Sequence, residues 1–122
     1  MKNLSKILLS SVFLFASSLG LADTQKTQRI NQFENHKVKV WQTVIYPDEK
    51  EKLKMHHHDR DRVVVALTDG ELKVMNDKGQ SHILKLEKGQ SYFLTKDVPN
   101  EMHTDENLSG HPIKVVVIDL KF

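Results

Sequence analysis

Residues 62–94 read RVVVALTDGELKVMNDKGQSHILKLEKGQSYFL, a stretch in which short apolar runs alternate with turn-forming residues. Its glycines, at 70, 79 and 89, recur at intervals of nine and ten residues. Segments 71–75 and 81–86 flank the turn signal Asn76-Asp77-Lys78-Gly79, which predicts a β-hairpin. Short strands at this spacing are typical of an all-β sandwich or barrel.

Short apolar runs separated by turn-forming residues also occur before and after residues 62–94. Expected strands cover 36–45, 53–58, 62–67, 71–75, 81–86, 91–94 and 112–120. A polar lead occupies 23–35, and no helical period follows it. We therefore predict a single all-β domain over 36–122.

The first 22 residues have the features of a secretory signal peptide. A short basic start is followed by an apolar stretch over 7–19 that is too short to span a bilayer stably, and Gly20 and Ala22 supply small residues for cleavage. We expect a mature protein that begins at Asp23 and is periplasmic or secreted, with no membrane span after processing. A lipid anchor is excluded because the chain has no cysteine.

Composition limits what the mature chain can do. Its 100 residues suffice for one domain with a modest core. The formal charge of +2 comes from Lys2 and Lys6, so the mature chain is close to neutral, which argues against a nucleic-acid binder. Without cysteine there are no disulfides, thiol nucleophiles or thiolate ligands. Any chemistry must use histidine, carboxylates, hydroxyls or arginine.

Three adjacent histidines precede residue 62. Side chains alternate faces along a strand, so His56 and His58 should point the same way, with Cα atoms about 7 Å apart, and His57 the opposite way. Two imidazoles at this spacing can converge on one cation, and histidine is a natural ligand of transition metals. His103 is the candidate third ligand. A solvated polar edge is the alternative interpretation of the run.

The order of these residues resembles the two motifs of small single-domain cupins. The first family motif is His-x-His, three or four residues, Glu and a later glycine; the second is Gly-x5-Pro-x-Gly-x2-His-x3-Asn. The matching positions are His56, His58, Gly70, Gly89, Pro99, His103 and Asn107. The resemblance covers about 38–120. It implies a cupin-type jelly-roll β-barrel in which the three histidines face one cavity and bind a divalent transition metal (Fe, Zn, Ni, Mn or Cu).

The chain departs from these motifs in three places. Arg62 stands where the family has its metal-binding glutamate, the second motif lacks its glycine, and the spacing from Pro99 to His103 is one residue short. Cupins with three histidines and no glutamate exist as iron enzymes, thiol dioxygenases among them. The resemblance therefore still implies a metal.

Arg62 raises an electrostatic problem. Strict alternation places it, with Arg60, on the face of the histidines. A dication and a guanidinium ~6 Å apart would repel by roughly 5 kcal/mol at an effective dielectric constant of about 20, before screening. Three solutions remain open at this point: Arg62 pairs with a carboxylate such as Glu101, an anionic ligand bridges metal and arginine, or a metal-free cavity binds an anion through Arg62.

Two classes of function follow. One is a metal-dependent enzyme, such as a dioxygenase or isomerase, that acts on a small anionic molecule. Its candidate catalytic residues are Glu101, Tyr92 and Arg62, with Asp105 as a further nearby acid. The other is a non-catalytic module that binds a small ligand or buffers a metal. The sequence leaves the substrate, the metal and the formation of a homodimer open.

Overall fold

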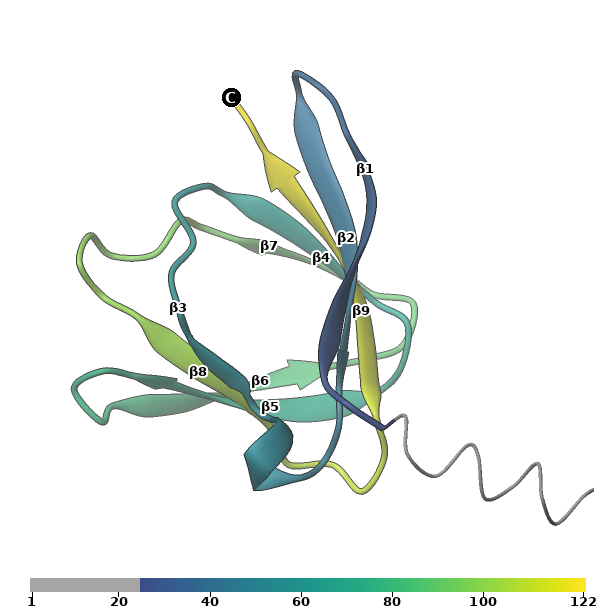
Figure 1. Cartoon of the computed structure of the whole chain (residues 1–122), viewed down its shortest axis with the longest axis vertical. Helices are drawn as coiled ribbons and strands as arrows, with labels where there is room; N and C mark the ends of the chain where they lie inside the picture. The colour runs from purple at the N-terminus through teal and green to yellow at the C-terminus, as the bar shows by residue number, and fades with distance from the viewer. Residues whose placement is uncertain (1–24) are drawn as a thin grey trace, which may run out of the picture.

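The computed structural model describes residues 25–122, and this part of the chain folds into two facing antiparallel β-sheets (Figure 1). The elements are β1 (Gln28–Glu34), β2 (Val38–Ile45), a short 3-10 helix (Glu49–Glu51), β3 (Leu53–His56), β4 (Arg62–Ala66), β5 (Gly70–Asn76), β6 (Ser81–Leu86), β7 (Ser91–Leu94), β8 (His103–Asn107) and β9 (Ile113–Leu120). Within 25–122 no helix is long and apolar enough to cross a membrane.

The strands are divided so that most chain neighbours lie in different sheets. Sheet A has the order β1-β2-β9-β4-β7, and sheet B has the order β3-β8-β5-β6. Strands distant in sequence therefore pair: β2 with β9, β4 with β9, and β3 and β5 with β8. This is a jelly-roll arrangement, and it confirms the predicted all-β class.

The inner faces of both sheets form the core. Alternate residues of β2, β4 and β9 point inward, as the period of two requires. The fully buried side chains include Ile45, Leu86 and Ile113, and Trp41 is 2% exposed. Gly70 permits the close approach of β5 to β9, because a Cβ there would lie 2.4 Å from the Ile113 side chain.

Most expected strands are present with small changes at their ends, but two strands were not anticipated. β1 lies within the polar lead and pairs with β2, and β8 lies between the expected strands at 91–94 and 112–120. All seven residues of β1 are exposed, so this strand carries little apolar signal. The predicted signal peptide, 1–22, lies outside the described residues.

Asn107, the last residue of the second cupin-like motif, has a structural place at the end of β8. Its side-chain amide donates to the carbonyl oxygens of Ile45, at 2.8 Å, and His111, at 2.7 Å. Its side-chain oxygen accepts from the Ser109 amide at 2.7 Å. The side chain is 3% exposed and links the end of β2 to the β8–β9 connection.

Candidate metal centre

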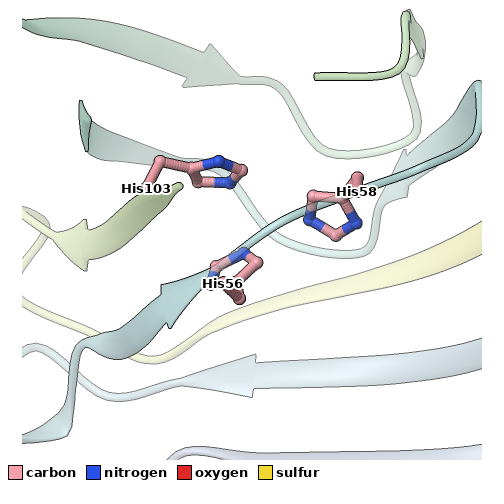
Figure 2. Close-up of side chains that lie close together, drawn as sticks. All are labelled: His56, His58 and His103. Atoms are coloured by element: carbon pink, nitrogen blue, oxygen red, sulfur yellow. The ribbon is translucent and has the colours of Figure 1, made fainter. Parts of the chain in front are cut away.

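The three predicted ligands, His56, His58 and His103, lie together (Figure 2). His56 ends β3 and is in register with His103, the first residue of β8. His58 lies two residues beyond β3, where the chain leaves sheet B. The ring centroids of His56 and His103 are 4.3 Å apart, those of His56 and His58 are 4.9 Å apart, and one ligand nitrogen from each ring lies within 4.8 Å of the others.

The Nδ1 atoms of two of these rings have oxygen atoms of the protein nearby. Nδ1 of His56 is 2.6 Å from the Lys54 carbonyl oxygen, to which it can donate. Nδ1 of His103 is 3.2 Å from Oδ2 of Asp97. When such a ring is neutral and its proton is on Nδ1, the lone pair that can bind a metal is on Nε2. Outer partners of this kind set the tautomer of metal-binding histidines.

Burial favours the neutral, metal-binding form of His58 and His103, whereas His56 is biased toward a protonated form that a metal must displace. Burial, together with the neighbouring Arg62, lowers the pKa of His58 to about 3, so its ring is neutral at neutral pH. Burial also lowers the pKa of His103. Burial acts in the same direction on His56, but the Asp105 carboxylate and the Lys54 carbonyl outweigh it and raise the pKa of His56 above its usual value.

His57 lies apart from the cluster, as alternation predicted. Its Nδ1 is 2.7 Å from the carbonyl oxygen of Glu101, and its Nε2 is 3.0 Å from Asp59, whose side chain is 86% exposed. The contact with Glu101 ties the loop after β3 to the loop before β8, whereas Asp59 belongs to the same loop as His57. His57 therefore has a structural place beside the site.

Arg62 occupies the cavity wall, but Arg60 does not. Arg62 is 8% exposed, at the start of β4, and lines the cavity together with the three histidines. The prediction that Arg60 shares the face of the histidines is wrong, because Arg60 is exposed at a bend between β3 and β4. The chain is not extended there, so the alternation of faces that a strand imposes is lost.

The charge of Arg62 is offset by a residue that the sequence interpretation missed. Nη1 of Arg62 is 3.9 Å from Oδ1 of Asp97, whereas Glu101, the expected partner, forms no ion pair with it. Burial lowers the pKa of Arg62, and the carboxylates of Asp97, Asp105 and Asp119 act against this. Acidic groups around Arg62 thus reduce the repulsion that a bound dication would meet.

Asp97 connects the parts of the site. Its Oδ2 accepts from the backbone amide of His58 at 2.8 Å, and its own amide donates to the His58 carbonyl at 2.9 Å. The same carboxylate contacts His103 and Arg62. Asp97 follows β7 and precedes a turn at Val98–Glu101, in which Asn100 has a φ of 64°. In the sequence, the only sign of this role of Asp97 is an acidic residue two positions before Pro99.

A cavity of about 610 Å³ adjoins the histidines between the two sheets. Apolar core residues such as Trp41 and Leu72 line its inner part, and polar residues including Glu101, Asp105 and His82 line it elsewhere. Tyr92 is not among its lining residues, and the hydroxyl of Tyr92 accepts from the Glu87 amide at 2.8 Å. Of the predicted acids and bases, Glu101 and Asp105 thus border the cavity.

The residues present fit a divalent transition metal. Three imidazoles form a borderline-soft donor set, and a site with three protein ligands leaves positions for water or a small molecule. Nδ1 of His56 is hydrogen-bonded to the Lys54 carbonyl oxygen, and Nδ1 of His103 has the Asp97 carboxylate 3.2 Å away. The cavity supplies the space into which the open positions would face.

Asp97→Asn should weaken metal binding by about 10- to 100-fold, the range typical of partners that orient a ligand histidine. The amide is uncharged, so it neither offsets Arg62 nor accepts as strongly from His103. Zinc titration of the purified protein measures the change. Asp59→Asn, which alters an exposed acid of the same loop region, is the matched control. Equal affinities for wild type and Asp97→Asn would contradict the role given to Asp97.

Comparisons with known proteins agree on the fold. No family model matches the chain, and no curated protein matches it. Among solved structures, a cupin domain from Bordetella pertussis Tohama I is 28% identical, with a TM-score of 0.67, over 80% of this chain and 95% of the other. RmlC-like cupins from Methanocaldococcus jannaschii (13% identity, TM-score 0.59, 80% and 83% covered) and Desulfovibrio desulfuricans (17%, 0.57, 81% and 86%) are also similar. The described part of the chain has the jelly-roll fold of small cupins and carries a three-histidine group that could hold a metal.

Proposed function

We propose that the protein is an exported cupin that binds one divalent transition metal through His56, His58 and His103, together with a small anionic molecule. The observation that carries this proposal is the convergence of three imidazole nitrogens, within 4.8 Å of one another, beside the cavity of about 610 Å³. Bound there, the metal would polarise a coordinated oxygen or activate dioxygen.

The anionic character of the ligand rests on Arg62. Its guanidinium is nearly buried in the cavity wall and its contact with Asp97, at 3.9 Å, is longer than a charge-assisted hydrogen bond. Nη1 donates to the Thr95 carbonyl oxygen at 3.3 Å. Several donors of the guanidinium therefore remain for a carboxylate or phosphate, which arginine can bind with two parallel bonds.

Substitution of Glu101 distinguishes an enzyme from a non-catalytic binding module. A dioxygenase or isomerase needs a group that moves a proton near the substrate, and Glu101 is the carboxylate that lines the cavity without contacting the histidine cluster. An enzyme would lose turnover in Glu101→Gln and keep its metal. A binding module would show unchanged ligand affinity in the same variant.

Elemental analysis of the purified mature protein tests the metal directly. We expect about one transition-metal ion per chain, and reloading of the chelated protein with zinc should restore that ratio. A protein that contains no metal and takes up none after reloading would refute the proposal. Titration of the chelated and reloaded forms with phosphate and with acetate then tests the anion.

The proposed export rests on the sequence of residues 1–22. The intact mass of the protein recovered outside the cytoplasm should correspond to a chain that begins at Asp23. Recovery of only the full-length precursor, in the membrane fraction, would contradict cleavage after Ala22.

A further inference from the structure

We propose that Asp105 is a fourth protein ligand of the metal and supplies, from β8, the carboxylate that position 62 lacks. This inference rests on the proposed metal site. It concerns a residue that neither cupin-like motif specifies, because Asp105 occupies a variable position between the histidine and the asparagine of the second motif.

The geometry of β8 brings Asp105 to the histidines. Residues two apart in a strand point to the same face, so Asp105 and His103 both face the cavity, which they both line. On the neighbouring strand β3, His56 is in register with His103 and Leu53 with Asp105. The side chain of Asp105 is 14% exposed, so the protein holds it largely out of water.

The distances from Asp105 to two of the three histidines match those between ligands of one ion. Oδ2 of Asp105 is 3.4 Å from Nε2 of His56, and Oδ1 is 3.8 Å from Nε2 of His103. Ligands about 2.1 Å from a tetrahedral zinc are about 3.4 Å from each other. A charge-assisted N–H···O bond would be shorter, about 2.7–2.9 Å. The carboxylate thus lies near Nε2 of both rings.

The contacts of the Asp105 carboxylate are with the ligand histidines. Among the described residues, its only ion-pair contacts within 4.0 Å are with His56 and His103. No hydrogen bond to a backbone amide or hydroxyl holds its carboxylate in this part of the chain. A divalent ion bound between the two rings would pair with this largely covered carboxylate in place of a proton on His56.

The assignment also accounts for Arg62. With three neutral imidazoles alone, a dication beside Arg62 would be offset only by Asp97 and more distant acids. A directly bound carboxylate cancels one unit of the metal's charge, which lowers the repulsion from the guanidinium. The anionic ligand and the metal can then occupy the cavity together.

Zinc titration of Asp105→Asn and Asp105→Ala tests the inference. We expect the dissociation constant to rise at least about tenfold in both, because each variant loses the anionic ligand and keeps the three histidines. Glu106→Gln is the matched control, since Glu106 is the next residue of β8, lies on the opposite face and does not line the cavity. Its zinc affinity should equal that of the wild type.

The crystal structure of the zinc complex separates a ligand from a residue that only orients the rings. An Asp105 oxygen about 2.0–2.2 Å from zinc supports the inference. An oxygen more than about 3 Å away overturns it, even if the variants bind more weakly, and so do unchanged affinities. A wild-type protein that binds no zinc refutes the proposed function and this assignment together, whereas the other outcomes bear on Asp105 alone.

Discussion

His103→Ala should raise the dissociation constant for zinc by more than about 100-fold, since loss of a ligand exceeds the 10- to 100-fold cost of losing the partner that orients one. His56→Ala and His58→Ala should have effects of similar size. Each removes one of the three nitrogens that lie within 4.8 Å of one another. A zinc ion with fewer protein ligands must complete its shell with water, which dissociates readily. Competition titration with a chelator of known affinity measures these changes.

His36→Ala is the control for this series, because His36 is exposed in the β1–β2 connection. His82 is less suitable, since it lines the cavity near its rim. Circular dichroism and thermal unfolding must show that each variant is folded. If all four alanine variants bind zinc equally, or if His36→Ala weakens binding as much as His103→Ala, the three-histidine site is refuted.

Arg62→Glu should tighten zinc binding by at least about tenfold and weaken phosphate binding by a comparable factor. The substitution replaces a cation in the cavity wall with a carboxylate, so repulsion of the dication becomes attraction, while the anion loses its guanidinium. The interaction acts in a largely buried setting, where screening by salt is weak. Separate calorimetric titrations with zinc and with phosphate measure the two affinities.

Arg62→Gln separates charge from coordination in this experiment. Glutamine removes the positive charge without adding an anionic ligand, so zinc affinity should lie between those of the wild type and Arg62→Glu. Arg62→Gln also remains informative if Arg62→Glu fails to fold. A glutamate at this position would place a second carboxylate close to Asp97, whereas a glutamine would not. If folded Arg62→Glu binds zinc no more tightly and phosphate no more weakly, the charge of Arg62 does not act on the site.

Local geometry explains what could be predicted. The turn signals and the period of two depend on neighbours in the chain, and they led to the all-β class and to most strand positions. The same rule placed His56 and His58 on one face and His57 on the other. It failed at Arg60, because the chain bends between β3 and β4.

Several features of the site depended on contacts between distant segments. The exposed strand β1 exists because it pairs with β2, and its own residues carry little apolar signal. Asp97 reaches Arg62 and His103 only because the loop after β7 packs against the loop after β3. Neither contact follows from spacing along the chain.

The sequence by itself determined the strand-rich fold class and the pair of histidines that share a face, because both follow from backbone geometry over a few residues. The tertiary structure alone decided that His103 lies opposite His56, that Asp97 offsets Arg62, and that Asp105 lies near Nε2 of both histidines. These relations depend on the register between β3 and β8 and on the conformation of two loops. Register and loop conformation are set by packing between segments about 40 to 50 residues apart, which no local pattern encodes.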